Sequence, residues 1–443
     1  MTPNFSAIIL AAGEGTRMKS ANPKILHKIG GRSLIHHVLA SLEPLKPENI
    51  TIVLAPSMKE LESHLTPHRV VYQDRALGTA HAVKSAETST KASQGDIAIL
   101  FGDTPFIETG TIKRLLARRK EQDNPALVLL GMRPTSPKGY GRYITDNDGY
   151  LLNIVEERDA TESQRQIGLC NGGVMLVDRE FLWSGLKEIQ ANNVKGEYYL
   201  TDLVAIAVRK NRKVAYLEVS ETEILGINDR QELANAEMVF QRKKRKEILD
   251  KGVTLINPET IYFSADTDIA QDCIIGPSVF FGPGVRLQGN VEVRAFSHLE
   301  GVEIKKNAQI GPFARLRPGT IVGENAHIGN FVEVKNSIIG NGAKANHLSY
   351  LGDAKVGERA NIGAGTITCN YDGFQKSTTE IGADVFIGSN SALIAPVTIG
   401  KGAIIGAGSV ITENVKEDSL ALARAKQEEK PGWAAKFREW RKK

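Results

Sequence analysis

The feature of this 443-residue sequence that most restricts its fold is a six-residue repeat of apolar residues between Ile269 and Ile411. A period of six matches neither the 3.6-residue turn of an α-helix nor the two-residue alternation of a strand. It is typical of a hexapeptide β-helix, in which short strands joined by corners form triangular coils and each sixth side chain points inward. The repeat runs, with slips in its register, through Ile269, Ile275, Phe281, Leu287, Val293, Leu299, Ile304, Ile310, Leu316, Val322, Ile328, Val334, Ile339, Ala345, Leu351, Val356, Ile362, Thr368, Ile381, Ile387, Leu393, Ile399, Ile405 and Ile411.

Glycine often follows the repeated residue, as in Ile275-Gly276 and Ile399-Gly400, and supplies the backbone freedom that a corner needs. A single coil cannot bury its own apolar residues, so the coils must stack on one another. Residues 253–412 would make roughly nine coils and about 40 Å of prism. The alternative, a glycine-rich sandwich, would not keep a six-residue register over this length.

Residues 1–228 have the different pattern of an α/β domain, with short apolar runs between turn residues and helical patterns between the runs. Two of these helices are expected at residues 111–120 and 202–210. In such a domain, ligands bind at the carboxyl ends of the parallel strands. The predicted strands are Phe5–Leu10, Ile50–Leu54, Ile97–Phe101, Ala126–Leu130 and Val174–Val177.

The first predicted strand leads into a turn with two glycines, Gly13 and Gly15, and then two cations, Arg17 and Lys24. Such a turn lets backbone N–H groups approach a phosphate or a base, and the cations can meet phosphate oxygens. The spacing fits neither the dinucleotide-binding fingerprint nor the P-loop. Asp103 follows another predicted strand, where its carboxylate is well placed for Mg²⁺, which prefers oxygen ligands.

Several segments of this half, taken together and in order, resemble the sugar-1-phosphate nucleotidyltransferases. The segments are Leu10-Ala-Ala-Gly, Gly15-Thr-Arg-Met, Pro23-Lys24, Gln73 with Leu77-Gly78-Thr79, Gly102-Asp103 and Gly139-Tyr-Gly-Arg. With the hexapeptide prism behind them, essentially the whole chain resembles the bifunctional bacterial enzymes of UDP-N-acetylglucosamine synthesis. The implied fold is a Rossmann-like nucleotidyltransferase domain followed by a left-handed parallel β-helix.

The resemblance implies two activities, which serve peptidoglycan and lipopolysaccharide precursors. The prism would acetylate glucosamine-1-phosphate from acetyl-CoA, and the first domain would then transfer UMP from UTP to N-acetylglucosamine-1-phosphate. The second transfer needs no general base, because the attacking phosphate is already ionised, but it needs alignment and charge neutralisation. By resemblance, Arg17 and Lys24 offset the charge of the triphosphate, and Asp103 and Asn228 hold Mg²⁺.

The resemblance also implies which residues bind the nucleotide sugar. They are Leu10, Ala11, Ala12, Gly13, Lys24, Gln73, Gly78, Thr79, Phe101, Gly102, Asp103, Gly141, Glu156, Asn171 and Asn228. Two positions depart from the commonest pattern, since Phe101 stands where tyrosine is frequent and Gly172 where threonine is usual. Neither departure touches a charged role, so they affect the detail of the sugar pocket rather than the reaction class.

The acetylation step does need a base, because an amine must be neutral to attack a thioester. His347 lies two positions after an inward anchor, so it should face outward, and Glu333 could orient its imidazole. The repeat breaks at Cys369–Gly373, and loops inserted into rigid repeats usually bind something. By resemblance, Arg317, Lys335, Tyr350 and Asn361 bind glucosamine-1-phosphate, and Ala364, Asn370, Tyr371, Ser389, Ala407 and Arg424 bind acetyl-CoA.

We therefore predict a uridylyltransferase domain at 1–229, a helical linker at 230–250 and an acetyltransferase domain with a tail at 251–443. The basic run that begins at Gln241 is expected to lie on the solvated outside of the linker helix. A formal charge of +5 does not indicate nucleic-acid binding. Neither a signal-peptide pattern nor a membrane-spanning run is apparent, which indicates a cytoplasmic protein. The resemblance implies a homotrimer with acetylation sites shared between subunits.

Two other readings remain open. The chain could be a sugar-1-phosphate nucleotidyltransferase of other specificity with a purely structural β-helix, although a spacer needs neither His347 nor the inserted loop. It could also be a scaffold without catalysis, which the combination of Arg17, Lys24, Asp103 and Asn228 argues against. An assay of acetyl transfer from acetyl-CoA to glucosamine-1-phosphate separates the three.

Overall fold

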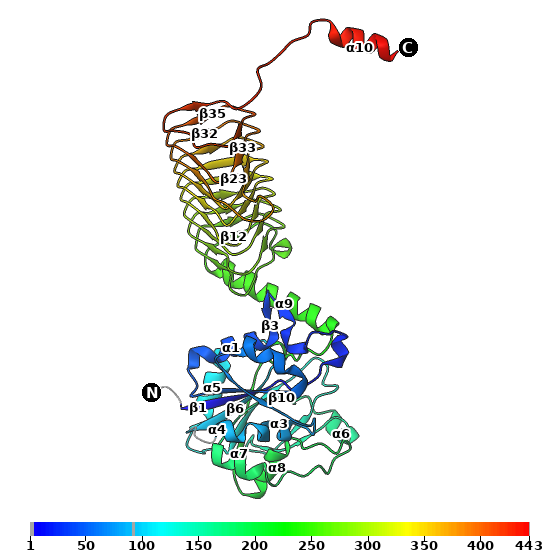
Figure 1. The fold of residues 1–443 in the computed structure, drawn as a ribbon. Coiled ribbons are helices and arrows are strands. Elements are labelled where there is room, and N and C mark those ends of the chain that lie inside the picture. Colours follow the sequence, from blue (N-terminus) through cyan, green and yellow to red (C-terminus); the bar gives the residue numbers. More distant parts are fainter. Residues whose placement is uncertain (1–3, 91–93, 443) are drawn as a thin grey trace. The chain divides into compact units, whose positions relative to one another are not determined.

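The computed structural model describes residues 4–90 and 94–442 (Figure 1). The chain divides into two compact units, Met1–Phe240 and Gln241–Lys443. Among the described residues, no helix is both long and apolar enough to cross a membrane.

The first unit is built on a nine-stranded sheet whose main path runs β11-β7-β10-β6-β1-β4-β5. Along this path, neighbouring strands are parallel except at β10, which runs antiparallel to both β6 and β7. Off the path, β8 runs antiparallel to both β9 and β10. The prediction of a parallel strand is therefore wrong for Val174–Val177, which lies in β10. Its strands are β1 (Phe5–Leu10), β4 (Ile50–Leu54), β5 (Arg69–Tyr72), β6 (Asp96–Phe101), β7 (Leu127–Met132), β8 (Arg142–Thr145), β9 (Leu151–Val155), β10 (Cys170–Val177) and β11 (Val214–Glu218), and β2 (Lys28–Ile29) and β3 (Arg32–Ser33) form a separate small pair.

Helices cover this sheet because its central strands are apolar on both faces. Every residue of β1, for example, is buried, as expected of a strand between two layers of helices. The helices of the unit are α1 (Leu34–Leu42), α2 (Glu62–Leu65), α3 (Thr79–Ser85), α4 (Glu87–Thr90), α5 (Thr109–Arg119), α6 (Glu162–Arg165), α7 (Arg179–Gly185) and α8 (Asp202–Arg209).

One helix, α9 (Arg230–Asp250), contributes to both units. Its first half belongs to the core of the first unit, where Phe240 and Ala236 pack with Met18, Ile29 and Leu34. The backbone N–H of Gly30 also donates to Glu237 Oε2 at 2.9 Å. The first unit therefore includes the first half of α9 and ends at Phe240 rather than at residue 229.

This division predicts how the first unit can be isolated. A fragment of residues 1–240 should fold and carry uridylyl transfer without acetyl-CoA, because it keeps the packed half of α9. A fragment of residues 1–229 should unfold at a lower temperature, because it exposes Met18, Ile29 and Leu34. Circular-dichroism melting of both fragments, with a uridylyl-transfer assay, checks this. A folded 1–240 fragment without uridylyl transfer would contradict the division.

The second half of α9 caps the first coil of the prism. Gln241 donates to the Phe263 carbonyl at 2.8 Å and accepts from the Phe263 N–H at 2.9 Å. Arg245 donates to the Ile261 carbonyl at 3.1 Å and binds the Glu259 carboxylate at 2.7 Å. The expectation that this basic run is solvated is therefore wrong for Gln241, Lys244 and Arg245, all of which are buried. Gln241 and Arg245 satisfy backbone groups at the end of the stack, which no further coil covers. Lys244 donates to the Glu247 carboxylate at 3.3 Å.

The second unit is a prism of stacked coils, as the six-residue repeat predicts. All the repeated residues are buried in it. The strands form three parallel sheets of ten, eight and eight strands. The first sheet contains β12 (Thr254–Leu255), β14 (Ile274–Ile275), β17 (Glu292–Val293), β20 (Gln309–Ile310), β23 (His327–Asn330), β26 (Lys344–His347), β29 (Asn361–Ile362), β32 (Phe386–Ile387), β35 (Ile404–Ile405) and β37 (Leu420–Ala421).

Successive strands along the chain belong to the three sheets in turn, so each coil contributes a strand to each sheet and each strand pairs with the equivalent strand of the next coil. The second sheet contains β13 (Asp268–Ile269), β16 (Arg286–Leu287), β19 (Val302–Ile304), β22 (Thr320–Val322), β25 (Ile338–Ile339), β28 (Ala354–Val356), β31 (Thr379–Ile381) and β34 (Val397–Ile399). The third contains β15 (Phe280–Phe281), β18 (His298–Leu299), β21 (Arg315–Leu316), β24 (Glu333–Lys335), β27 (Tyr350–Gly352), β30 (Ile367–Cys369), β33 (Ala392–Ile394) and β36 (Val410–Ile411).

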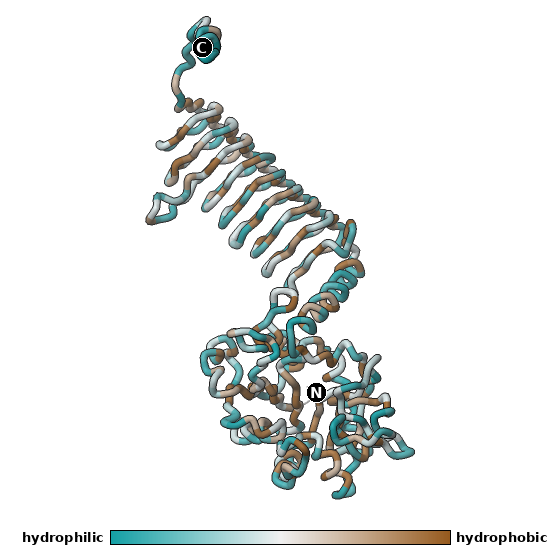
Figure 2. The backbone as a smooth tube through the Cα atoms, turned by 90° about the vertical axis from the view of Figure 1, so that its right-hand side faces the viewer, coloured by the Kyte–Doolittle hydropathy of each residue, from teal (hydrophilic) through white to brown (hydrophobic). Residues whose placement is uncertain are grey.

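One loop leaves the stacked coils after β30, and it is visible as an excursion from the prism (Figure 2). It is a hairpin, since the Ser377 N–H donates to the Asn370 carbonyl at 2.9 Å and Tyr371 bridges Lys376. At its tip, Asp372 accepts from the N–H groups of Phe374 and Gln375. The chain ends in an exposed helix, α10 (Trp433–Arg441).

Candidate active sites

The first candidate site lies at the carboxyl edge of the central strands. Leu10 of β1 is in register with Phe101 of β6, and the Gly102 N–H donates to the Leu10 carbonyl at 2.9 Å. On the other side of β1, the Gln73 N–H donates to the Leu54 carbonyl at the end of β4. The loops that follow these strands therefore meet at one edge, as the α/β pattern predicts.

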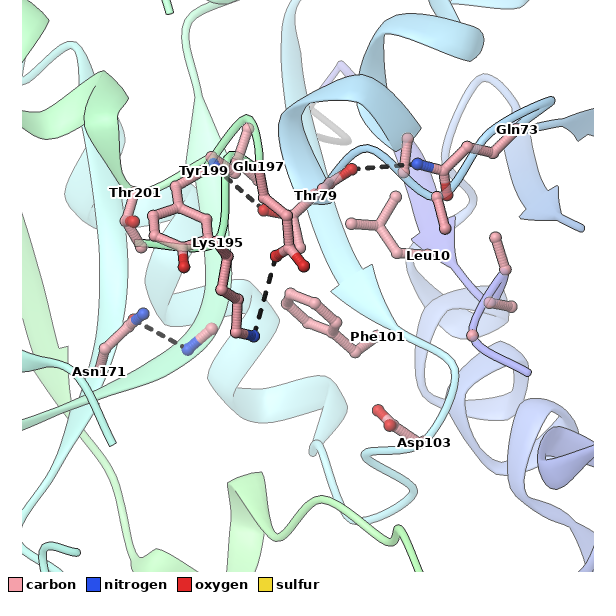
Figure 3. A pocket seen from close by; sticks show the side chains of 18 of the residues that line it. Leu10, Gln73, Thr79, Phe101, Asp103, Asn171, Lys195, Glu197, Tyr199 and Thr201 are labelled. Carbon is pink, nitrogen blue, oxygen red and sulfur yellow. Dashed lines mark hydrogen bonds and ion pairs between the residues drawn. The ribbon is translucent and has the colours of Figure 1, made fainter. Parts of the chain in front are cut away.

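A cavity of about 500 Å³ opens at this edge (Figure 3). Twelve of the residues predicted to bind the nucleotide sugar line it: Leu10, Ala11, Ala12, Gly13, Lys24, Gln73, Gly78, Thr79, Phe101, Asp103, Glu156 and Asn171. They come from six separate segments of the chain, so the fold brings together residues up to about 160 positions apart.

Four other predicted residues, Arg17, Gly102, Gly141 and Asn228, lie outside the cavity lining. Gly141 is adjacent, because its carbonyl accepts from the Asn171 N–H at 2.8 Å. Gly102 packs behind the glycine turn, where an added Cβ would lie 3.1 Å from the Ala11 Cβ. Arg17 is exposed on the short 3-10 helix Thr16–Met18.

Lys24, Asp103 and Asn228 form a cluster of one cation and two oxygen ligands at this edge of the sheet. The Lys24 ammonium forms an ion pair with Asp103 Oδ2 and donates to Asn228 Oδ1 at 3.2 Å. The carboxylate and the amide oxygen thus face the same positive charge. Oxygen ligands of this kind suit a small hard cation, so these residues fit Mg²⁺. Among the described residues, no group of three or more His, Cys, Asp or Glu could hold a metal by itself.

The close approach of Lys24 depends on Gly15. This glycine has a φ of 62°, and a Cβ added there would lie 2.5 Å from the Lys24 Cβ. Side chains other than glycine are strained at such a φ and would also collide with the lysine. At Gly13, by contrast, an added Cβ would meet nothing within 4 Å, which leaves the turn open toward a ligand.

One wall of the cavity was not predicted from the sequence. The segment from Lys195 to Thr201 lies across the cavity from Leu10 and Gln73 (Figure 3). It is held there by the Tyr198 backbone, which packs against Gly78, and by the Leu200 N–H, which donates to Thr79 Oγ1 at 3.0 Å. The one signal in the sequence was the polar and aromatic run Glu197-Tyr198-Tyr199, two residues before helix α8. Within this wall, Lys195 Nζ lies 3.9 Å from Glu197 Oε2.

Another part of the cavity lining contains a half-buried carboxyl group and a fixed amide. Thr201 Oγ1 donates to Glu156 Oε1 at 3.5 Å, and Asn171 Oδ1 accepts from the Gly173 N–H at 2.9 Å. The unusual Gly172 has a packing reason, because a side chain there would collide with Ile224.

The Glu156 carboxyl group should make the stability of the first unit depend on pH. Burial raises its pKa, so the folded chain keeps this proton at a pH where the unfolded chain has lost it. The free energy of unfolding therefore falls as pH rises from the ordinary glutamate pKa, about 4.3, to the raised value. A Glu156→Gln protein should have a higher Tm than the wild type at pH 7, and the gain should shrink toward pH 4. Calorimetry at both pH values tests this, and a gain independent of pH would contradict it.

The second candidate site lies on the prism. One side of this site is the corner at which the chain passes from a strand of the first sheet to a strand of the third. His347, Ala364, Ser389 and Ala407 occupy this corner in successive coils. They are connected by backbone hydrogen bonds, such as the Asn390 N–H to the Ala364 carbonyl at 2.7 Å and the Gly408 N–H to the Ser389 carbonyl at 2.8 Å. Arg424 donates to the Ala407 carbonyl at 2.6 Å and continues the row.

His347 is exposed, as predicted. Its Nδ1 lies 2.6 Å from Asn330 Oδ1, and the two residues are partners between β23 and β26. Glu333, which we expected to orient the imidazole, instead pairs with Arg317 at 2.9 Å. The orienting group in this structure is thus the amide of Asn330, which the sequence did not indicate. An amide oxygen only accepts, so Nδ1 carries the proton and Nε2 is left with a free lone pair.

The opposite side of the second site lies at the other end of the third-sheet strands. Arg317 and Lys335 are at these ends, Tyr350 faces outward within β27, and Asn361 is on β29 of the neighbouring sheet. A strand of three residues spans about 10 Å. Arg317 and Lys335 therefore lie about one strand length along the sheet from the corner that carries His347, on the second and first coils before that of His347.

A further cation joins this side from the inserted loop. The nearby Lys335 ammonium lowers the pKa of Lys376. Two neighbouring ammonium groups that repel each other would both be stabilised by a bound anion such as a phosphate. The sequence did not single out Lys376, because its proximity to Lys335 depends on how the hairpin folds back.

Comparison with known proteins agrees with this two-part organisation. The family described as MobA-like NTP transferase domain matches residues 7–142, and the bacterial transferase hexapeptide family matches residues 301–336 and 378–413. Proteins named bifunctional protein GlmU are similar over nearly their whole length. Those of Zymomonas mobilis and Paramagnetospirillum magneticum are 50% and 49% identical, over 99% and 98% of this chain and 98% and 96% of the relatives. The protein of Sphingopyxis alaskensis is 47% identical over 99% of this chain and 97% of its own.

Hexapeptide repeats of this family form left-handed β-helices, which is the predicted fold of the second unit. Since full-length relatives share about half of their residues with this chain and both halves match their own families, the chain belongs to the GlmU family of bifunctional transferases.

Proposed function

We propose that the chain catalyses two successive transfers. On the prism, an acetyl group passes from acetyl-CoA to the amine of glucosamine-1-phosphate. In the first unit, UMP passes from UTP to N-acetylglucosamine-1-phosphate, which gives UDP-N-acetylglucosamine and pyrophosphate. The observation that carries the bifunctional assignment is the exposed His347, fixed by Asn330 on a prism that also carries a cluster of cations. A prism that served only as a spacer would need neither.

In the uridylyl transfer, a phosphate oxygen of the sugar bonds to the α-phosphorus of UTP, and pyrophosphate leaves. The protein has to align the two phosphates and balance their charge, because the nucleophile is already ionised. Asp103 and Asn228 would hold Mg²⁺, which supplies positive charge to the phosphate oxygens when bound. Lys24 pairs with the same two residues in this structure and would then be free to bind phosphate. Glu156 and Asn171 would hold the sugar hydroxyl and amide groups.

In the acetyl transfer, the amine nitrogen bonds to the acetyl carbon, the C–S bond breaks, and CoA leaves as a thiolate. Nε2 of His347 would take the proton from the amine, since Nδ1 is engaged with Asn330. Arg317, Lys335 and Lys376 would bind the sugar phosphate. The corner residues Ala364, Ser389 and Ala407 would form the track along which acetyl-CoA lies.

The test of the proposed function is an assay of both reactions with the purified chain. With glucosamine-1-phosphate, acetyl-CoA and UTP, the chain should make UDP-N-acetylglucosamine. Without acetyl-CoA, the chain should make this product only when N-acetylglucosamine-1-phosphate replaces glucosamine-1-phosphate. Uridylyl transfer with no acetyl transfer would support the alternative of a nucleotidyltransferase with a structural prism.

We also propose that the chain acts as a homotrimer. Three phenylalanines, Phe296, Phe313 and Phe331, are stacked along the corner of the prism next to Asn330, with ring centroids 5.0 and 5.1 Å apart. Their side chains are 55%, 45% and 54% exposed, although apolar rings of this size are usually buried. A neighbouring prism would cover them and would also bring its own residues close to His347. The cytoplasmic location stays a prediction.

The trimer has a direct test in solution. Sedimentation equilibrium of the whole chain should give three times the chain mass of 48.3 kDa. A Phe313→Glu protein should dissociate, because a charge would be buried in the apolar contact. Uridylyl transfer should continue in the dissociated protein, whereas acetyl transfer should be lost. A monomeric chain with full acetyl transfer would contradict the proposal.

A further inference from the structure

Asp353 lies where the inserted hairpin Asn370–Ser377 leaves and re-enters the prism. It is the corner residue between β27 and β28, with a φ of 48°. This left-handed conformation is one that aspartate and asparagine tolerate better than most residues. The corner residue of the coil before it is Asn336, which has a φ of 45°. The coil after it carries the hairpin at the same corner.

Asp353 contacts both ends of the hairpin. Its Oδ2 accepts from the Asn370 side-chain amide, at the start of the hairpin. Its backbone carbonyl accepts from the Thr379 N–H at 3.3 Å, just after the hairpin ends. Its Oδ1 accepts from Asn336 Nδ2 at 2.6 Å, and its own N–H donates to the Lys335 carbonyl at 3.0 Å. One residue thus ties both ends of the hairpin to the two preceding coils.

The same carboxylate lies among the cations of the second site. Partial burial raises its pKa, but the hydrogen bonds from Asn336 and Asn370 and the charges of Lys335 and Lys376 lower it further, so that the pKa lies below its usual value. The group is therefore ionised at neutral pH. An ionised carboxylate can accept from both amides at once, one at each oxygen, which a neutral side chain of the same size cannot.

From this geometry we propose that Asp353 is a positioning residue for acetyl transfer, which holds the inserted hairpin in place and so sets Asn370 and Lys376 in the site. The inference rests on the proposed function, in which Asn370 contacts acetyl-CoA and Lys376 the sugar phosphate. Asp353 itself does not touch the reacting atoms. Its effect is on the position of the hairpin, and small displacements of binding groups have large effects on rate.

The test compares Asp353→Asn with Asp384→Asn in the full-length chain. Asparagine fits the same backbone conformation, but it has one acceptor oxygen in place of two, so it cannot hold both amides. Asp384 is a matched control, because it is also a corner residue, with a φ of 61°, and its carboxylate is also bonded, to Arg359 at 2.7 and 2.9 Å. It has no part in holding the hairpin ends.

We expect Asp353→Asn to lower kcat/KM for acetyl transfer about 10- to 100-fold and to raise the KM for acetyl-CoA. Hydrogen exchange should be faster at the Ser377 and Thr379 amides and unchanged in the neighbouring strand β32. Asp384→Asn should resemble the wild type in all three measurements, and both variants should keep uridylyl transfer and the oligomeric state.

Normal acetyl transfer by Asp353→Asn, or unchanged exchange at Ser377 and Thr379, would overturn the inference. Equal losses in the two aspartate variants would do so too, because they would indicate a general effect of corner carboxylates on stability. A wild-type chain without acetyl transfer would instead refute the proposed function. In that case, the exchange comparison still decides whether Asp353 holds the hairpin.

Discussion

A His347→Ala protein is expected to transfer acetyl groups about 10²- to 10⁴-fold more slowly than the wild type, the usual effect of removing a general base. The amine of the sugar phosphate carries a proton at neutral pH and cannot attack the thioester until it loses it. His347 is the group placed to accept that proton, because it is exposed and its Nδ1 is already bonded to Asn330. The loss should appear in kcat, with little change in the KM of either substrate.

The pH dependence of the same protein gives an independent measurement. Wild-type acetyl transfer should slow on the acidic side as the imidazole becomes protonated and can no longer accept a proton. That limb should be absent from the His347→Ala profile. His298→Ala is the matched control, since His298 also faces outward on the prism but stacks on Phe280. Near-normal turnover in a folded, trimeric His347→Ala protein would leave another group as the base, with Tyr350 the next candidate.

An Asp103→Ala protein is expected to lose uridylyl transfer by at least about 100-fold, because a change in a metal's supporting groups alone commonly costs 10- to 100-fold. Asp103 supplies the one carboxylate of the cluster around Lys24. Without it, Asn228 would be left as the sole protein ligand for the cation, and the charge on the phosphates would be less well balanced. Acetyl transfer should be unchanged, because that chemistry uses no metal.

Asp103→Asn separates the metal from the lysine. The asparagine can still accept a hydrogen bond from Lys24, but it has lost the charge that attracts a divalent cation. Titration calorimetry with Mg²⁺ and UTP should therefore show weaker binding in both variants, and higher Mg²⁺ should restore part of the activity of Asp103→Asn. If both variants lost the two activities equally, the cause would be misfolding rather than metal binding.

Much of the site in the first unit could be predicted because its residues follow strands. The carboxyl ends of parallel strands meet at one edge, so a motif after β1 and another after β6 had to be neighbours. The wall from Lys195 to Thr201 could not be predicted in this way. It reaches the cavity through contacts with Gly78 and Thr79, which are more than a hundred positions away in the chain. No local pattern records such a contact.

The helix α9 shows a similar limit. Its period and charge predict a helix, and a helix is present, but its pattern does not say that Phe240 packs in one unit while Gln241 and Arg245 cap the other. A cationic run is normally solvated, so burial could only follow from the unpaired backbone groups that the first coil presents. Likewise, β10 has the apolar run of a buried strand in either direction, because a strand's direction depends on its connections rather than its composition.

By itself, the sequence determined the prism, the inward direction of each sixth residue and the outward direction of His347, because the repeat sets which side chains face the core. It also predicted which strand ends meet at the edge that carries the first cavity. Only the tertiary structure decided the partners: Asn330 rather than Glu333 beside His347, Lys24 between Asp103 and Asn228, and Asp353 across the ends of the hairpin. The reason is physical. Periodicity is a property of neighbours along the chain, whereas these partners are 17 or more positions apart and meet only when coils stack and loops pack.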